Sequence, residues 1–120
     1  MILGIGVDTV DIARFERSID RTPSLRTRLF TEAERTLPMA SLAARFAAKE
    51  ALIKAIGDSY GLGWHDMEVL RGQGRKPSFA RTEALVQQLV ALGGDQIHLS
   101  MTHDGGMATA FVIVEAATEA

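Results

Sequence analysis

Residues 41–57 have the spacing of one long helix. Apolar side chains recur every three or four positions: Leu42, Phe46, Ile53 and Ile56. The segment contains no proline, Ser41 is available as an N-cap, and Gly57 can end the helix in the left-handed conformation. The pattern predicts an amphipathic helix that packs one face on a hydrophobic core.

The rest of the pattern predicts strands and shorter helices. The expected elements are a strand over 2–10, a helix over 11–21, a strand–turn–strand over 64–79, a helix over 82–94 and a β-hairpin over 97–116. The polar stretch 21–35 has room for a second short helix. The order β-α-α-β-β-α-β-β, with tight turns between paired strands, favours an α+β fold. The 120 residues, 47% of them hydrophobic, are expected to form a single domain over 1–120.

Composition points to a reducing compartment and away from membranes. The chain has no cysteine, which excludes disulfides, cysteine zinc sites and thiol catalysis. The N-terminus, MILGIGVD, lacks the basic region of a signal peptide. No apolar run approaches the length of about 18 residues that marks a membrane span. We therefore expect a soluble, cytoplasmic protein.

The charges are segregated although the net charge is only −2. All 13 lysines and arginines lie between Arg14 and Arg81, and residues 82–120 contain none. This distribution predicts a positive region for an anionic ligand or partner, and an ordinary solvated surface is the alternative. Nucleic acid is not an expected partner, because the chain is not basic overall and has few aromatic residues.

The first strand carries a carboxylate on a face without side chains. Alternation places Leu3, Ile5 and Val7 on one face, and Gly4, Gly6 and Asp8 on the other. Glycines inside a strand often mark the close approach of a ligand or of another backbone. If a ligand approaches the glycines, Asp8 faces a space in which that ligand can bind. If another backbone approaches instead, the long helix packs on the glycines and Asp8 caps the helix that follows.

A second carboxylate, Glu50, lies near Ile53 on the helix face that is expected to be buried. An unpaired buried charge is costly, so Glu50 needs a partner. Lys54, four residues on, could form an ordinary helical salt bridge with it. The alternative is that Asp8 and Glu50 together hold a divalent cation, either Mg²⁺ or Mn²⁺. Lys54 and Arg45 would then supply positive charge for the phosphates of a substrate.

Segment 11–21 presents a row of basic side chains if it is helical. Three arginines, which we call the arginine stripe, fall along one side: Arg14, Arg17 and Arg21. Apolar side chains gather on another face: Ile12, Phe15 and Ile19. The stripe predicts a docking surface for an acidic partner. A solvated face partly neutralised by Glu16 and Asp20 is the alternative.

Five segments of the chain resemble one known family and occur in that family's order. They are GIGVDTVDI at 4–12, FTEAE at 30–34, ARFAAKEALIKAIG at 44–57, GRKP at 74–77 and HLSMTHDGGMATAFVIVE at 98–115. On these motifs the chain is identified as a member of the holo-[acyl-carrier-protein] synthases, the small single-domain 4′-phosphopantetheinyl transferases. The resemblance extends from Ile2 to Glu115, and its most specific part is the pairing of Gly-Val-Asp on the first strand with RFAAKEA on the helix.

The resemblance implies transfer of 4′-phosphopantetheine from coenzyme A to a serine of an acidic acyl carrier protein, with release of adenosine 3′,5′-bisphosphate. It implies that Asp8 and Glu50 bind Mg²⁺ and that Lys54 lies beside the diphosphate. Arg45 matches a basic residue of the coenzyme A cleft, and His103 a histidine near the phosphates. The implied fold is an antiparallel sheet packed on a long central helix. The implied assembly is a homotrimer with active sites between adjacent subunits.

The resemblance also implies partner contacts. The GRKP turn suggests Lys76 and Pro77 as contacts of coenzyme A, and members of the family present a basic first helix to their carrier, which favours docking on the arginine stripe. Segment 35–44 is shorter than in many relatives, so the conformation of this loop at the cleft is not predicted.

Several alternatives stay open on the sequence. The base that deprotonates the serine is Glu50, Asp11 or a metal-bound water. His103 could assist, or simply hydrogen-bond within its hairpin. A metal-dependent phosphohydrolase would also use Asp8, Glu50 and Lys54, whereas a non-enzymatic nucleotide-binding module would not need Glu50. Neither the identity of the carrier nor the preferred metal follows from the sequence.

Overall fold

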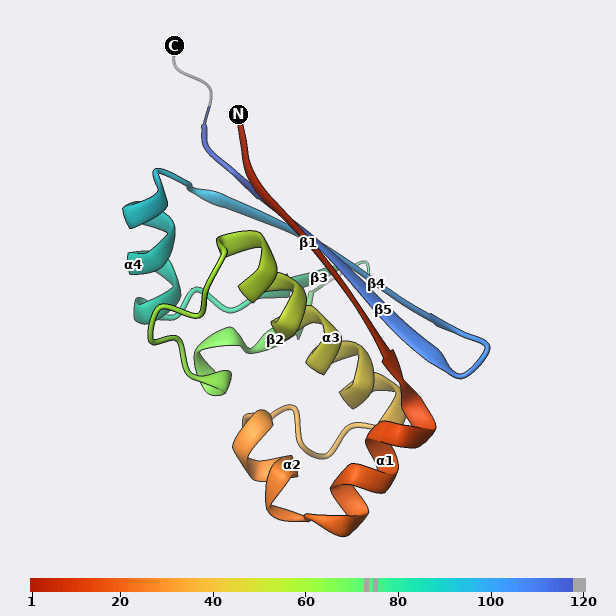
Figure 1. Cartoon of the computed structure of the whole chain (residues 1–120). Coiled ribbons are helices and arrows are strands. Elements are labelled where there is room, and N and C mark those ends of the chain that lie inside the picture. Colours follow the sequence, from red (N-terminus) through yellow and green to blue (C-terminus); the bar gives the residue numbers. More distant parts are fainter. Residues whose placement is uncertain (73, 75, 118–120) are drawn as a thin grey trace.

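The computed structural model describes residues 1–72, 74 and 76–117 (Figure 1). Three strands form an antiparallel sheet in the order β1-β5-β4: β1 (Ile2–Asp11), β4 (Gln96–Asp104) and β5 (Met107–Glu115). A separate antiparallel pair consists of β2 (Val69–Arg71) and β3 (Pro77–Phe79). The helices are α1 (Ile12–Arg21), α2 (Ser24–Leu29), α3 (Met39–Ile56), the 3₁₀ turn η1 (Trp64–Met67) and α4 (Glu83–Leu92).

The predicted α+β architecture is confirmed, and the short helix α2 adds one element to the predicted order. The helix predicted over 41–57 begins two residues earlier, at Met39, directly after Pro38. Ser41 therefore lies inside α3 and is not its cap. Gly57 ends the helix as predicted, with φ 103° in the left-handed region. No helix in the described ranges has both the length and the apolar character of a membrane span.

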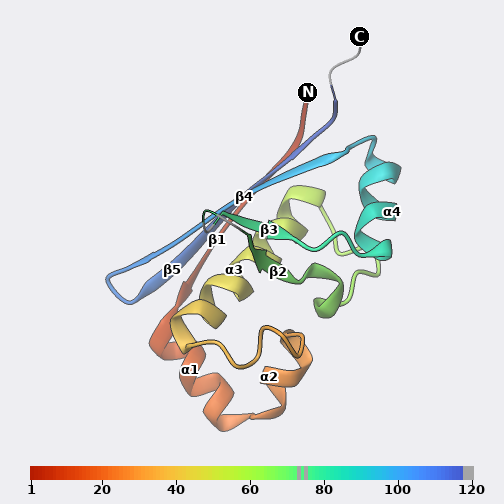
Figure 2. The same cartoon turned by 180° about the vertical axis from the view of Figure 1, so that it is seen from behind.

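All the helices lie on one side of the three-stranded sheet (Figures 1 and 2). The inner face of β5 buries a row of small and branched side chains, many of them against α3: Ala108, Ala110, Val112 and Val114. The outer face leaves Ile5, Val7 and Phe111 41–56% exposed. α3 is buried on most of its sides rather than on one, since it packs between the sheet and the segments α1, α2 and η1. The prediction of a simple amphipathic helix is therefore wrong.

Candidate active site

The two glycines of β1 allow α3 to lie directly on the strand. A Cβ atom on Gly4 would lie 1.8 Å from the carbonyl oxygen of Ala55, and one on Gly6 would lie 1.8 Å from that of Ala51. Any side chain at these positions would force the helix away from the sheet. The helix therefore occupies the space above the glycines, and the expectation of a ligand gap there is wrong.

This close approach brings Asp8 and Glu50 near each other at the edge of the sheet. Asp8 follows Gly6 on the same face of β1, and Glu50 adjoins Ala51 on α3. Both carboxylates are partly buried. Burial raises the pKa of Glu50, the negative charge of Asp8 raises it further, and Lys54 opposes both effects. The structure thus brings together the two carboxylates that the sequence singled out.

Lys54 contacts Asp8 rather than Glu50. Its ammonium donates hydrogen bonds to Asp8 Oδ1 and to the carbonyl oxygen of Val7, both at 3.0 Å. Lys54 therefore does not form the helical salt bridge with Glu50 that was one of the two alternatives, and among the described residues its side chain instead reaches across to β1. Asp11, not Asp8, caps α1 and accepts a hydrogen bond from the backbone N–H of Arg14 at 3.0 Å. Asp8 is therefore free of a capping role.

The donors at this edge fit a hard divalent cation. Glu50 has no hydrogen-bond or ion-pair partner in the described part of the chain. Its charge is therefore not neutralised there, and both burial and the charge of Asp8 raise its pKa. No third histidine, cysteine, aspartate or glutamate joins the two carboxylates within residues 1–72, 74 and 76–117. Mg²⁺ commonly takes one or two protein carboxylates and completes its shell with water and substrate phosphates. Asp8 and Glu50 could hold such an ion and leave positions for a substrate.

Replacing Glu50 with glutamine should stabilise the metal-free protein. Because folding raises the pKa of Glu50, the penalty for its charge is absent below the unfolded value of 4.5, grows as the pH rises above that value, and is complete once the pH exceeds the folded value. We expect Glu50→Gln to raise the Tm by about 2 °C in chelator at neutral pH, and not at pH below 4.5. Thermal unfolding at fixed protein concentration measures this. The exposed control Glu32→Gln should leave the Tm unchanged, and a lowered Tm for Glu50→Gln would refute charge crowding.

Arg45 lies on a different side of α3 from Lys54. The two residues are nine positions apart, which is about two and a half helical turns, so their side chains project in opposite directions. Arg45 is buried, and its guanidinium donates to the carbonyl oxygen of Ser41 at 3.4 Å. Burial lowers the pKa of Arg45; Glu34 opposes this shift and Arg71 adds to it. Within one chain, therefore, Arg45 and Lys54 do not face the same space.

The remaining predicted cofactor contacts lie on segments other than β1. His103 is exposed near the end of β4, the edge of the sheet opposite to β1. Lys76 is exposed directly before β3, and Pro77 opens that strand; the turn residue at 75 lies outside the described residues. One chain therefore carries two groups. We call Asp8, Glu50 and Lys54 the carboxylate group, and Arg45, Lys76, Pro77 and His103 the outlying group.

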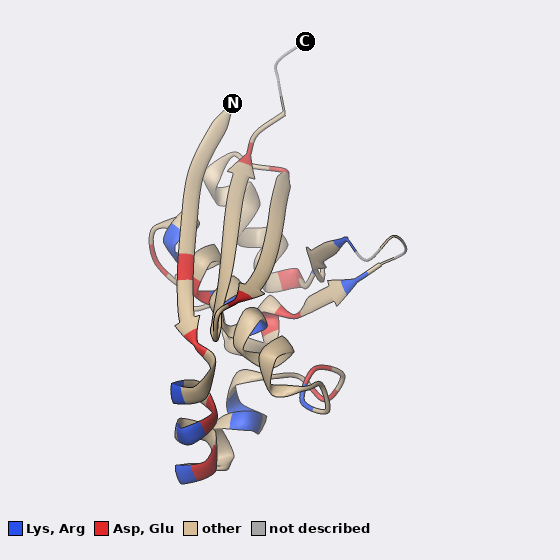
Figure 3. Cartoon of the chain, turned by 90° about the vertical axis from the view of Figure 1, so that its right-hand side faces the viewer, with Lys and Arg blue, Asp and Glu red and all other residues tan. Residues whose placement is uncertain are grey.

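The arginine stripe is exposed along α1, while Phe15 and Ile19 are buried beneath it, as the spacing predicts. Basic and acidic positions alternate along this helix (Figure 3). Arg14 also borders a hollow of about 360 Å³ between α1, β1 and α3. Its lining is mixed: the apolar residues Val10, Phe15, Phe46 and Met107 line it together with Thr9, Asp11, Arg14 and Ser18. The stripe thus lies next to a place where an apolar side chain of a partner could insert.

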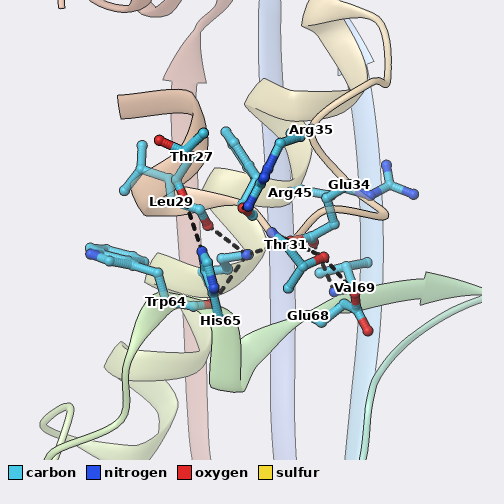
Figure 4. A network of polar contacts seen from close by, with 12 residues as sticks. Thr27, Leu29, Thr31, Glu34, Arg35, Arg45, Trp64, His65, Glu68 and Val69 are labelled. Carbon is cyan, nitrogen blue, oxygen red and sulfur yellow. Dashed lines mark hydrogen bonds and ion pairs between the residues drawn. The ribbon is translucent and has the colours of Figure 1, made fainter. Parts of the chain in front are cut away.

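A buried ion pair joins Lys49 to Glu34, and no local sequence pattern predicts it (Figure 4). Lys49 is 0% exposed, and its ammonium donates to Glu34 Oε1 at 2.7 Å. It also donates to the carbonyl oxygens of Leu29 at 2.7 Å and Trp64 at 3.1 Å. Glu34 Oε2 accepts from the backbone N–H of Val69 at 2.9 Å. The pair thus joins α3 to α2, η1 and β2.

All three donor directions of the Lys49 ammonium are occupied, so this lysine has none left for a substrate. Burial lowers the pKa of Lys49, and its hydrogen bond to Glu34 opposes that shift. Thr31 hydrogen-bonds to both Glu34 and Glu68, which fixes the FTEAE segment against the start of β2. Lys49 therefore has a structural role, although it adjoins Glu50 in the chain.

Comparison with known proteins identifies the relatives of this chain. Residues 4–111 match the family model described as the 4′-phosphopantetheinyl transferase superfamily. A holo-[acyl-carrier-protein] synthase from Leifsonia xyli subsp. xyli is 60% identical over 115 residues, which cover 96% of this chain and 98% of the relative.

Solved structures agree with this similarity. The crystal structure of holo-[acyl-carrier-protein] synthase from Neisseria meningitidis has a TM-score of 0.86 and 32% identity, and the match covers 96% of this chain and 99% of that one. A holo-(acyl-carrier-protein) synthase from Bacillus anthracis in complex with CoA (3′,5′-ADP) has a TM-score of 0.79 and 31% identity. That match covers 98% of this chain and 99% of the other.

Proposed function

The chain belongs to the holo-[acyl-carrier-protein] synthases of the 4′-phosphopantetheinyl transferase superfamily, and on this premise we propose its reaction, metal site and assembly. The proposed reaction is the magnesium-dependent transfer of 4′-phosphopantetheine from coenzyme A to a serine of an apo acyl carrier protein, with release of adenosine 3′,5′-bisphosphate. The observation that carries the metal site is the meeting of Asp8 and Glu50 beside Lys54. The coenzyme A ligand of the Bacillus anthracis relative supports the proposed donor.

The proposed chemistry is displacement at phosphorus. The serine oxygen bonds to the β-phosphorus of coenzyme A, and the bond from that phosphorus to the bridging oxygen breaks. Asp8 and Glu50 would hold Mg²⁺, which when bound neutralises charge on the diphosphate oxygens. Lys54 would neutralise the leaving 5′-phosphate of adenosine 3′,5′-bisphosphate, because negative charge accumulates on that phosphate as the bond breaks.

Two candidates for the base differ in their surroundings. Asp11 accepts the capping hydrogen bond of α1, and strand alternation places it on the face of β1 opposite to Asp8. Glu50 lies beside Asp8 and makes no hydrogen bond within the described ranges. This geometry favours Glu50, or a water bound to the metal that it would hold, over Asp11 as the group that receives the serine proton.

We propose that the complete site forms between subunits of a homotrimer. Asp8 and His103 lie on the two edge strands of the sheet, β1 and β4, and Arg45 projects away from Lys54 on α3, so a neighbouring copy would have to bring these groups together. The outer face of the sheet offers Ile5, Val7 and Phe111 as an exposed apolar surface, which supports self-association through this face. Arg45 and His103 of one subunit would then bind coenzyme A beside the carboxylates of the next.

We propose that the acyl carrier protein docks on α1. Reversing two charges of the arginine stripe, Arg14→Glu with Arg21→Glu, should raise the apparent KM for the carrier at least tenfold, about 1.4 kcal/mol. The KM for coenzyme A should change little, and added salt should weaken the wild type more than the variant. Steady-state kinetics at two salt concentrations would measure both constants. A raised KM for coenzyme A with an unchanged KM for the carrier would assign the stripe to the coenzyme A cleft.

Mass spectrometry of an apo acyl carrier protein tests the proposed reaction. The carrier is incubated with the enzyme, coenzyme A and Mg²⁺, with chelator in a parallel sample. We expect the carrier to gain the mass of one phosphopantetheine only when metal is present. Cleavage of coenzyme A without a carrier, and no gain of mass with one, would instead identify a metal-dependent phosphohydrolase.

A further inference from the structure

We propose that Lys54 neutralises Asp8 while the site is empty, and that it moves to the diphosphate of coenzyme A when the metal takes over the Asp8 carboxylate. This inference rests on the proposed metal site and adds a coupling between the two ligands. The metal would replace Lys54 as the partner of Asp8, and the diphosphate of coenzyme A would replace Asp8 as the partner of Lys54. The metal and coenzyme A would therefore each bind more tightly in the presence of the other.

The first observation is that Lys54 occupies an oxygen that a metal would need. Its ammonium lies 3.0 Å from Asp8 Oδ1, and the neighbouring Glu50 carboxylate has no bonded partner in the described ranges. The ammonium is bonded to only one of the two Asp8 oxygens, but a dication that binds both carboxylates would lie close to it, so the two positive charges would compete for Asp8. The remaining contact of Lys54, to the carbonyl oxygen of Val7, places the cation beside Asp8 and not beside Glu50.

The second observation is that Lys54 is free to move. The Lys54 side chain is 53% exposed, while that of Asp8 is 19% exposed. Its neighbour one and a half turns earlier, Lys49, is 0% exposed and bonded to three buried acceptors, so Lys49 cannot exchange partners. An exposed ion pair is worth about 1 kcal/mol or less, which a diphosphate with several acceptor oxygens can replace.

The two observations together give a thermodynamic coupling. Without coenzyme A, a metal that displaces Lys54 leaves that ammonium with no anionic partner. With coenzyme A, the displaced ammonium pairs with phosphate oxygens, and this new pair replaces the free energy lost with the Lys54–Asp8 ion pair. Because such coupling is reciprocal, the metal must strengthen the binding of coenzyme A by the same factor.

Binding of Mn²⁺ alone, measured by calorimetry or electron paramagnetic resonance at fixed ionic strength, tests the competition. Lys54→Met should bind Mn²⁺ about two- to fivefold more tightly than the wild type. Arg28→Met, which removes one exposed positive charge of α2, is the control and should bind as the wild type does. When coenzyme A is added, the gain in Mn²⁺ affinity should be larger in the wild type than in Lys54→Met.

Asp8→Asn separates failure of this inference from failure of the proposed site. If Asp8→Asn loses Mn²⁺ binding but Lys54→Met binds no more tightly than the wild type, the competition is refuted and the metal site stands. If Asp8→Asn binds Mn²⁺ as well as the wild type, the metal site and the inference are both wrong.

The ammonium signal of Lys54 provides a structural readout that does not depend on activity. The chain has three lysines, so ¹⁵N-lysine labelling gives a simple spectrum in which the buried Lys49 serves as the reference. We expect the Lys54 signal to shift on addition of Mg²⁺ with coenzyme A while the Lys49 signal stays. An unchanged Lys54 signal in the saturated complex would refute the transfer between partners.

Discussion

Replacing Asp8 or Glu50 with alanine is expected to abolish phosphopantetheine transfer while the fold is retained. Both side chains lie at the edge of the sheet, outside the two buried clusters that form the core. Loss of either carboxylate would remove a ligand of the proposed metal, which contributes several kcal/mol to stabilising a phosphoryl transition state. A loss of about 4 kcal/mol corresponds to a rate about a thousandfold lower.

The measurement is the initial rate of transfer at saturating coenzyme A and carrier, over a range of Mg²⁺ concentrations. Circular dichroism and Tm show whether each variant is folded. Asp20→Ala, which removes an exposed carboxylate of α1, is the matched control and should keep the wild-type rate at saturating carrier. A folded Asp8→Ala or Glu50→Ala enzyme with near wild-type turnover at ordinary Mg²⁺ would refute the assignment of the ligands.

Lys49→Met is expected to produce the largest loss of stability of any single change considered. Removing the ammonium leaves the carboxylate of Glu34, which is 1% exposed, without its cation and leaves two carbonyl oxygens without a donor. Breaking a buried pair in this way costs about 3–5 kcal/mol. Since the total stability of a domain is about 5–15 kcal/mol, the variant should unfold at much lower denaturant concentration or temperature.

Equilibrium unfolding in denaturant, at one fixed protein concentration, measures this loss. The exposed control Lys76→Met should change the free energy of unfolding by less than about 0.5 kcal/mol. In the double variant Glu34→Gln with Lys49→Met, the unpaired charge is gone while the acceptor for Val69 remains. Its loss should be smaller than the sum of the two single losses, and strict additivity would show that the two groups do not interact.

The carboxylate group could be predicted because its signals are local. Strand alternation identifies the face of Asp8, and helical periodicity shows that Glu50 lies among apolar side chains. The meaning of the glycines could not be predicted, because Gly4 and Gly6 permit the approach of a ligand and of a helix equally well. Only the packing of α3 on β1 decides between these possibilities.

Ion pairs between residues far apart in the chain could not be predicted from the periodicity of hydrophobic positions. Lys54 has a well-placed partner four residues away, yet it contacts Asp8, which is 46 residues away in the chain. Lys49 could have been noticed, because Leu52 and Ile56 share its side of the helix. Its partner Glu34 lies in a stretch without periodicity, so no local pattern connects the two. The division of the candidate site between two edges of the sheet likewise depends on strand order and not on local sequence.

Anomalous diffraction from crystals grown with Mn²⁺ and coenzyme A would test the proposed site most directly. We expect one manganese peak within bonding distance of the carboxylates of Asp8 and Glu50 and of diphosphate oxygens. Lys54 should have left Asp8 for the diphosphate, and His103 should approach from a neighbouring subunit. A manganese ion that is bound elsewhere, or a diphosphate seated away from both carboxylates, would contradict the proposed site.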